Sequence, residues 1–158
     1  MQKIVTNFWF DRQAEEAARF YTSIFPNSKI GAIAYYGDGA PLPKGTVLTV
    51  EFQLDGQDFI ALNGGPEFQF TPATSFMITC ENQAEVDYYW SKLTEGGAEE
   101  QCGWLRDKYG LSWQVVPAII NKLLLDGDQA RVDSVMQALY QMRKIEIEPL
   151  LQAYEKVR

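Results

Sequence analysis

The sequence predicts an α+β fold in which two βαβββ modules form a curved mixed sheet around a cleft, followed by C-terminal helices. Three observations predict it: strand-like and helix-like segments follow one another in the order βαβββ, that order occurs twice, and an apolar helical pattern comes after it. We assign the modules to residues 1–66 and 73–117 and the helical extension to residues 118–158, within a single compact domain overall.

The first module opens with a strand pattern and then a helix pattern. β-Branched and aromatic residues fill positions 4–10. Asp11 offers a side-chain oxygen as the helix N-cap, and apolar residues recur at helical spacing until Pro26 ends the helix. The remaining strands of this module are expected at residues 29–36, 47–54 and 57–63.

The strand at 47–54 has the clearest alternation in the chain. Apolar residues occupy one face, and Thr49, Glu51 and Gln53 occupy the other. Asp55-Gly56 is a hairpin turn signal that joins this strand to the next. One side of the first sheet is therefore expected to be apolar and the other mixed.

The second module repeats this order, and helices follow it. Asn82 is expected to cap the module's helix, which ends at Gly96-Gly97. The strands of the module are expected at residues 75–80, 99–101, 104–108 and 111–116. The tail predicts three helices, at 118–125, after a cap at Asp126 or Asp128, and at 145–157 with Pro149 in the first turn.

An internal repeat supports the two-module interpretation. Gln13-Ala14-Glu15 recurs 70 positions later as Gln83-Ala84-Glu85, at the same place in each strand–helix unit. A one-sided strand must bury its apolar side, so Phe8 and Phe10 are expected to face the first helix. The opposite faces then carry isolated polar groups among aromatic residues, which suits a ligand cleft. The alternative is a solvent-facing surface or a dimer seam.

We expect this cleft to bind a small organic molecule through Asn7, Trp9, Glu51, Asn63 and Gln114. Glu51 is also a candidate for a catalytic base, because a carboxylate enclosed in a cavity can accept a proton. Phe68 and Phe70 are expected either to form a lid over the cleft or to anchor the linker between the modules.

Charge and composition exclude several function classes. The chain has 14 Lys and Arg against 21 Asp and Glu, a net charge of −7, and no basic cluster. Because phosphate backbones and anionic membranes attract clustered basic residues, we expect neither nucleic acid nor membrane partners. The opening residues lack the pattern of a secretory signal, so we expect a cytoplasmic protein whose two cysteines, Cys80 and Cys102, are reduced.

Several segments resemble the PhnB-like branch of the glyoxalase / bleomycin-resistance / extradiol-dioxygenase (vicinal oxygen chelate) superfamily. The resemblance covers nearly the whole chain. Its segments are Phe8-Trp9-Phe10-Asp11, Ala14-Glu15-Glu16-Ala17, Phe20-Tyr21, Phe25-Pro26-Asn27-Ser28, Ala61-Leu62-Asn63-Gly64-Gly65-Pro66, Cys102-Gly103-Trp104-Leu105, Gly110 to Pro117 and Met136 to Ala153. It implies paired βαβββ modules around a cavity, usually in homodimers, and this branch often bears the label demethylubiquinone methyltransferase.

The resemblance also implies a metal site that the residues do not provide. Catalytic members of the superfamily hold a divalent ion with His and Glu, but this chain has no His. Its matching positions carry Thr6 or Asn7, Asn63, Ser75 or Met77, and Gln114. Neutral amides and hydroxyls bind a transition metal poorly, so we expect no metal. No glycine-rich strand-to-helix turn supports a methyl-donor cofactor, so we expect no cofactor either.

Three hypotheses about function follow from these residues. The leading one is a metal-free small-molecule-binding protein of the glyoxalase/bleomycin-resistance fold. The second is a metal-independent enzyme that uses Glu51 as general base. The third is a homodimeric interaction module whose C-terminal helices make the contact. The sequence names neither the ligand nor a reaction.

Overall fold

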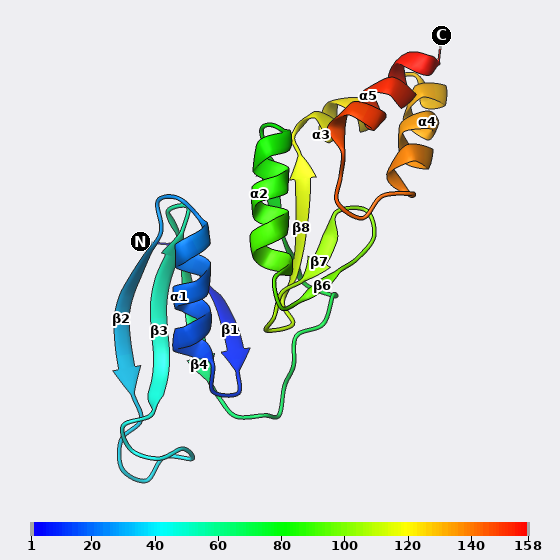
Figure 1. The fold of residues 1–158 in the computed structure, drawn as a ribbon. Coiled ribbons are helices and arrows are strands. Elements are labelled where there is room, and N and C mark those ends of the chain that lie inside the picture. Colours follow the sequence, from blue (N-terminus) through cyan, green and yellow to red (C-terminus); the bar gives the residue numbers. More distant parts are fainter. Residues whose placement is uncertain (1, 158) are drawn as a thin grey trace. The chain divides into compact units, whose positions relative to one another are not determined.

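The structure, a computed structural model, describes residues 2–157. The chain divides into two compact units, Met1–Phe70 and Thr71–Arg158. The described residues form two four-stranded sheets, one in each unit (Figure 1). The predicted α+β class with two modules and C-terminal helices is confirmed, and each module has a sheet of its own.

The first module runs β1-α1-β2-β3-β4 and has the strand order β1-β4-β3-β2. β1 pairs with β4 in parallel, and the other pairs are antiparallel. Helix α1 packs against β3 and β4 and covers one face of the sheet (Figure 1). The elements are β1 (Thr6–Phe10), α1 (Ala14–Ile24), β2 (Lys29–Tyr35), β3 (Val47–Leu54) and β4 (Gln57–Asn63).

The second module has the same topology. Its strand order is β5-β8-β7-β6, again with its first and last strands paired in parallel. Helix α2 packs against β8, β7 and β5. The elements are β5 (Ser75–Cys80), α2 (Gln83–Thr94), β6 (Ala98–Glu99), β7 (Trp104–Arg106) and β8 (Ser112–Pro117). Two modules with one element order and one pairing scheme are what the internal repeat predicts.

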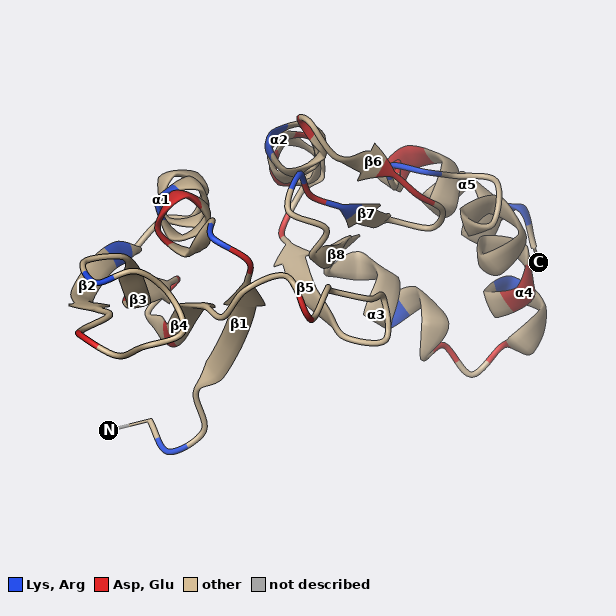
Figure 2. Cartoon of the chain, turned by 90° about the horizontal axis from the view of Figure 1, so that it is seen from below, with Lys and Arg blue, Asp and Glu red and all other residues tan. Residues whose placement is uncertain are grey.

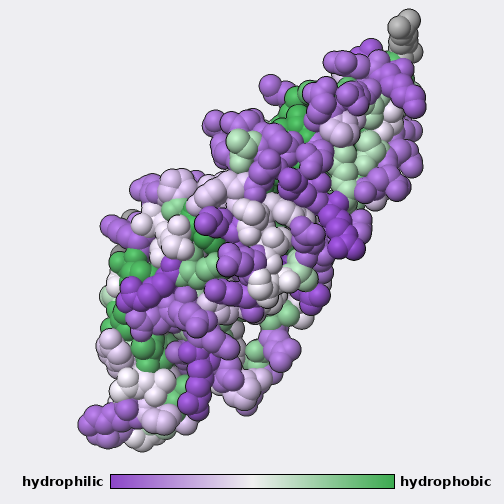
Figure 3. All heavy atoms as spheres, in the orientation of Figure 1, coloured by the Kyte–Doolittle hydropathy of each residue, from purple (hydrophilic) through white to green (hydrophobic). Residues whose placement is uncertain are grey.

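The core of the first module is aromatic. Phe8 and Phe10 are buried beneath α1, as predicted. Phe59 stacks on Phe8 at 5.6 Å and on Phe52 at 5.5 Å between ring centroids. Such stacked pairs add stabilisation beyond the area they bury. On the face shown in Figure 3, apolar residues are visible over β2 and β3, with hydrophilic residues around them.

Three helices follow β8: α3 (Ile119–Leu124), α4 (Gln129–Leu139) and α5 (Ile147–Lys156). Asp128 caps α4, because its side chain accepts a hydrogen bond from the backbone N–H of Ala130 at 3.0 Å. These helices enclose a small core of their own. Its buried members are Val116, Ile120, Leu123, Val135, Leu139, Ile145 and Leu150.

Several element ends differ from the expected ones; β7, for example, ends at Arg106 rather than at 108, and α5 covers 147–156 rather than 145–157. Two of the differences have a clear physical cause. Asp11 does not cap α1: the cap position is Gln13, whose side chain makes no cap hydrogen bond, and the N–H of Ala14 donates instead to Asn63 at 2.9 Å. Strand β6 occupies 98–99 rather than 99–101, because Ala98 pairs with Arg106 and the chain then turns through Cys102, at φ 58°.

Charged residues of both signs are interspersed. Among the described residues, Lys and Arg do not gather on one element (Figure 2). None of the described helices combines the length and the apolar character that crossing a bilayer requires.

Candidate functional site

The candidate site lies on the face of the first sheet that α1 does not cover, which we call the open face. Strand register places Asn7 and Glu51 on either side of Ile60, in one row across β1, β4 and β3. Trp9, Leu62 and Thr49 form the next row. The pairing thus brings three predicted ligand residues, Asn7, Trp9 and Glu51, onto one surface.

A pocket of about 290 Å³ opens on this face beside Glu51. Its volume is near the lower end of the range for small-molecule sites, about 300–1,000 Å³. Of the predicted ligand residues, Glu51 lines it. The full lining is Gln2, Val5, Lys29, Gly31, Glu51, Phe52, Gln53, Asp58, Phe59 and Ile60.

The polar groups of the pocket fall into two kinds. Asp58 is held in place: Gln53 donates to its carboxylate at 2.7 Å, and the side-chain amide of Gln2 bonds both its backbone N–H, at 3.0 Å, and its backbone C=O, at 3.2 Å. Glu51 and Lys29 are exposed, and within residues 2–157 their side chains have neither a hydrogen bond nor an ion pair. Two opposite charges are therefore available to a ligand.

Sequence reasoning did not find Lys29, Asp58 or Gln53 as pocket residues. For Gln53 and Asp58 the signal exists, because alternation puts Gln53 on the same face as Glu51 and the hairpin pairs Gln53 with Asp58. Lys29 gives no local signal. Its place follows from its pairing with Gln53, across a strand pair whose register is interrupted between Ile30 and Ile33.

Trp9 is fixed on the open face by the chain that follows β4. Its indole N–H donates to the backbone oxygen of Gly65 at 2.9 Å. Its ring lies so close to Gly64 that a Cβ atom there would be 2.3 Å from ring carbon Cζ2. The exposed ring of Phe68 meets Trp9 edge-to-face, with centroids 5.0 Å apart. Trp9 and Phe68 thus form an aromatic corner at the edge of this face.

Phe68 and Phe70 differ in their surroundings. Phe70 packs edge-to-face against Phe10 at 5.3 Å and Phe8 at 5.9 Å, so it joins the aromatic core of the first unit. Phe68 is 62% exposed. Phe70 therefore fits the alternative in which the residue anchors the linker after β4. A role as a lid over the cleft stays a prediction for Phe68 alone.

Asn63 lies on the other face of the sheet, contrary to our expectation. It is buried; its side-chain oxygen accepts from the N–H of Ala14 at 2.9 Å, and its amide nitrogen donates to Val47 at 3.0 Å. The physical reason is the period of two along β4, which groups Asn63 with the buried Phe59 and Ala61. Here Asn63 joins the start of α1 to the sheet.

Gln114 belongs to the second sheet. It is partly buried, pairs across the sheet with Met77 and Trp104, and donates a hydrogen bond to the hydroxyl of Ser75 at 2.9 Å. The adjacent hydroxyl of Ser112 is buried without a partner among the described residues. Gln114 therefore has its own polar surroundings within the second unit.

The residues present do not fit a divalent metal ion. The side-chain oxygen of Asn63 accepts from Ala14 and its amide nitrogen donates to Val47, while the amide nitrogen of Gln114 donates to Ser75. Within the described part of the chain, no group of three or more His, Cys, Asp or Glu side chains is placed to hold an ion. Neutral amide oxygens carry no charge and are poor ligands for a transition metal.

The strand-to-helix turns do not fit a nucleotide-type cofactor. Such cofactors use a glycine-rich turn whose helix N-terminus is open to the ligand. The turns at 11–13 and 81–82 contain no glycine. Both helix starts are already capped, α1 by Asn63 and α2 by Asn82, which accepts from Glu85 at 2.9 Å.

Cys80 offers no activated nucleophile. Burial, with the Glu85 carboxylate nearby, raises the pKa of the Cys80 thiol to about 12. A thiol with a raised pKa carries little of the reactive thiolate near neutral pH. The thiol of Cys102 lies 3.7 Å from the carbonyl oxygen of Leu139.

The first module and nearly all of the second match a known family. Residues 2–116 match the family described as 3-demethylubiquinone-9 3-methyltransferase. A PhnB protein from Bacillus cereus is 41% identical with a TM-score of 0.68, and the match covers 74% of this chain and 100% of that chain. The helices α3 to α5 begin after the family match ends.

Two other solved structures are similar at lower identity. A protein from Pseudomonas aeruginosa is 20% identical with a TM-score of 0.62, over 74% of this chain and 98% of that one. A glyoxylase/bleomycin resistance protein/dioxygenase domain from Frankia is 16% identical with a TM-score of 0.45, over 74% of this chain and 92% of that one. No curated protein matches the sequence at a significant level.

Proposed function

Because the chain belongs to the 3-demethylubiquinone-9 3-methyltransferase family, the PhnB-like branch of the glyoxalase / bleomycin-resistance fold, we propose that it binds a small organic molecule without a metal ion. The ligand occupies the open face of the first sheet. Asn7 and Glu51 supply polar contacts there, and Trp9 supplies an aromatic surface.

One observation carries this proposal: the open face has a pocket, and two charged side chains in it have no partner among residues 2–157. Helix α1 covers the other face, where the apolar core lies. The open face mixes the apolar Ile60 with Asn7 and Glu51 in one row. Small-molecule sites have this composition of apolar walls and a few oriented polar groups.

The donor chemistry supports the metal-free part of the proposal. A divalent transition ion needs imidazole, thiolate or carboxylate ligands in a converging group. The side-chain oxygen of Asn63 already accepts from Ala14, and Gln114 offers only a neutral amide, whose nitrogen donates to Ser75. We derive no methyl-transfer step, because the strand-to-helix turns do not provide a cradle for a nucleotide-type methyl donor.

A ligand screen with a blocking variant tests the proposal. We expect thermal-shift and ligand-observed NMR screening to find binders whose signal is lost in Ile60→Arg, which places a long side chain across the pocket floor. Tyr35→Arg, at an exposed position of the edge strand β2 and outside the pocket lining, is the matched control. Binders that Ile60→Arg leaves unaffected would place the site elsewhere, and chelator treatment that abolishes binding would contradict the metal-free proposal.

A second candidate is a metal-independent enzyme with Glu51 as proton acceptor. The observation in its favour is that the Glu51 carboxylate lines the pocket without a partner among the described side chains. Glu51→Gln keeps the size of the side chain and removes its basicity. NMR follows binding and conversion of a screened compound. If the variant still binds the compound but no longer converts it, the result supports the enzyme assignment. Conversion at an unchanged rate would contradict it.

A further inference from the structure

We propose that the pocket beside Glu51 selects a small zwitterion, a molecule with an ammonium group and a carboxylate group on a short apolar body. This inference rests on the proposed function and adds the chemical class of the ligand. The juxtaposition that carries it is one carboxylate and one ammonium group, Glu51 and Lys29, that lie in a single small pocket and have no partner among the described residues.

The two charges are placed by strand pairing. Lys29 on β2 pairs with Gln53 on β3, so it lies on the same face as Gln53 and therefore as Glu51, two residues away along β3. Among residues 2–157 neither side chain has a partner. A ligand that carries both complementary charges can form a charge-assisted hydrogen bond with each.

The other polar groups of the pocket are committed to the protein. The Asp58 carboxylate accepts from Gln53 at 2.7 Å, and the Gln2 amide is used by the Asp58 backbone. These contacts fix the wall between the N-terminal segment and β4. They leave Glu51 and Lys29 as the charged groups that can reorient toward a ligand without breaking a bond within the protein.

The floor of the pocket suits a short apolar body. Val5 and Ile60 supply apolar surface. Gly31 lines the pocket without a side chain, and a Cβ atom there would lie 3.2 Å from the Glu51 backbone oxygen, so a larger residue would crowd β3 at this point. At about 290 Å³, the pocket favours a molecule of the size of an amino acid over a large multi-ring compound.

Simpler charged ligands leave one group unsatisfied. A phosphate or a plain carboxylic acid can pair with Lys29 but brings negative charge toward Glu51 and Asp58. A plain amine can pair with Glu51 but leaves Lys29 without a counter-charge. Like-charge contacts and unpaired charges both lower affinity, so the pair discriminates in favour of the zwitterion.

Three compounds with similar hydrocarbon bodies test this inference. Leucine carries both charges, 3-methylbutylamine carries the ammonium group, and 4-methylpentanoate carries the carboxylate. By isothermal titration calorimetry we expect leucine to bind about tenfold more tightly than either single-charge compound, the effect of one charge-assisted bond. Equal binding of all three, or no binding of leucine at millimolar concentration, would overturn the inference.

Charge-neutralising variants assign each group to its partner. Glu51→Gln should weaken leucine and 3-methylbutylamine about tenfold and leave 4-methylpentanoate unchanged or tighter. Lys29→Gln should weaken leucine and 4-methylpentanoate and spare the amine. Glu67→Gln and Lys3→Gln are the matched controls, because both residues lie in the same unit and outside the pocket lining, and they should change nothing.

The outcomes separate this inference from the proposed function. If uncharged compounds bind, Ile60→Arg abolishes that binding and the charge variants do not affect it, the zwitterion inference is wrong and the proposed function stands. If Ile60→Arg leaves every binder unaffected, the proposed function fails and the inference fails with it.

Discussion

The two modules share one topology, yet they begin their helices in different ways. In the first module, the N–H of Ala14 is satisfied by Asn63, a residue 49 positions later in the sequence. In the second, the helix start is satisfied locally by Asn82, three positions before Glu85. The comparison teaches that the repeated apolar pattern sets the fold, while each module satisfies its polar groups independently.

A second contrast concerns the residue after the last strand of each module. Gly64 donates its N–H to Phe10 at 2.9 Å, and Ala118 donates its N–H to Cys80 at 2.7 Å. Phe10 and Cys80 are equivalent positions of the repeat. The first module needs glycine because the ring of Trp9 fills the space of a Cβ atom; the position equivalent to Trp9 is Thr79.

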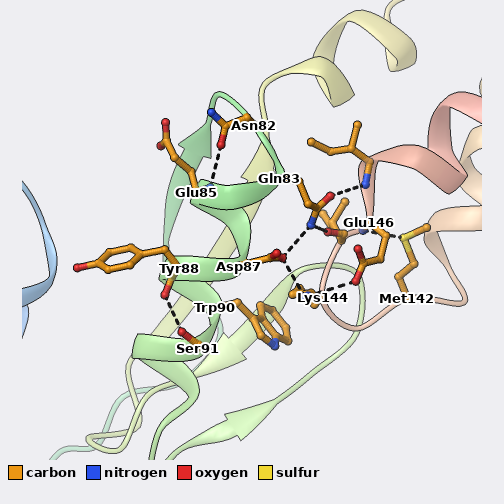
Figure 4. A network of polar contacts seen from close by, with 12 residues as sticks. Asn82, Gln83, Glu85, Asp87, Tyr88, Trp90, Ser91, Met142, Lys144 and Glu146 are labelled. Atoms are coloured by element: carbon orange, nitrogen blue, oxygen red, sulfur yellow. Dashed lines mark hydrogen bonds and ion pairs between the residues drawn. The ribbon is translucent and has the colours of Figure 1, made fainter.

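A third contrast concerns the equivalent residues Gln13 and Gln83. The Gln13 side chain makes a local contact with the backbone of Arg12 at 3.2 Å. The Gln83 amide bonds two backbone groups of the C-terminal extension, the oxygen of Ile145 at 3.0 Å and the N–H of Ile147 at 2.8 Å (Figure 4). One position of the repeat has thus acquired a long-range role in the second module.

Replacing Asn63 should give the largest loss of stability and tests the first contrast, between a long-range and a local helix cap. We expect Asn63→Leu to lower the free energy of unfolding of the first unit by about 3 kcal/mol, because the buried N–H of Ala14 and the partly buried C=O of Val47 both lose their partner. Urea unfolding, with hydrogen exchange to report on α1, measures this.

The matched variant is Asn82→Ala, an exposed cap that should cost about 1 kcal/mol in the second unit. Asn63→Asp keeps the acceptor for Ala14 and should recover part of the loss. Equal costs for the Asn63→Leu and Asn82→Ala variants would remove the distinction between a long-range and a local cap.

Substituting Gly64 tests the second contrast. Gly64→Ala should destabilise the first unit by about 2 kcal/mol, within the usual range for overpacking, because Trp9 must move. Gly37→Ala is the control, since nothing lies within 4 Å of a Cβ atom there. In the double variant Trp9→Thr with Gly64→Ala, which imports the arrangement of the second module, the added cost of Gly64→Ala should largely disappear in a double-mutant cycle.

Removing Gln83 tests the third contrast. Gln83→Ala should weaken the docking of α5 by about 1 kcal/mol, seen as faster hydrogen exchange in residues 147–156, because two backbone groups exchange a protein partner for water. Gln13→Ala should change the free energy of unfolding by less than about 0.5 kcal/mol. Comparable effects for the two variants would mean that the amide bridge contributes nothing specific.

The smallest effect is a pH dependence of the same docking region. Hydrogen bonds from Gln83 and Lys144 lower the pKa of Asp87, whose carboxylate lies 2.9 Å from Lys144 (Figure 4). A carboxyl whose pKa falls on folding stabilises above its ordinary value, about 3.9, and that stabilisation is lost as pH falls through the lowered value.

We therefore expect wild type to exceed Asp87→Asn in unfolding free energy by less than about 0.5 kcal/mol at neutral pH, with the gap closing below pH 4. Asp133→Asn is the control, because Asp133 likewise accepts from a glutamine four positions earlier, Gln129, at 2.8 Å, and no ion pair of the described residues involves it. A gap that persists at low pH would assign the effect to packing.

Much of the fold follows from the sequence because strand and helix patterns are local. The strands at 47–54, 57–63 and 75–80 have the predicted bounds, and Asn82 caps α2 as expected. The start of α1 could not be predicted, because its cap comes from a residue distant in sequence. For the same reason, the bridge from Gln83 to the extension has no local signal.

The candidate site was predicted in part. Asn7, Trp9 and Glu51 share a face because a period of two places them there. Applying the same period to β4 would have assigned Asn63 to the buried face with Ala61. The pocket beside Glu51 depends on which strand lies next to β3 and in what register, and the sequence pattern of β2 does not specify its pairing.

The glutamine amide has the same donor and acceptor as a peptide group. Gln2 presents it to the backbone of Asp58, and Gln83 presents it to a segment of the C-terminal extension. A side chain of this kind supplies one donor and one acceptor to a backbone segment, as a residue of a neighbouring strand does. In both cases a single amide bonds two backbone groups and joins a segment outside the sheet to its module, so that segment is held without any change in the pairing of the strands.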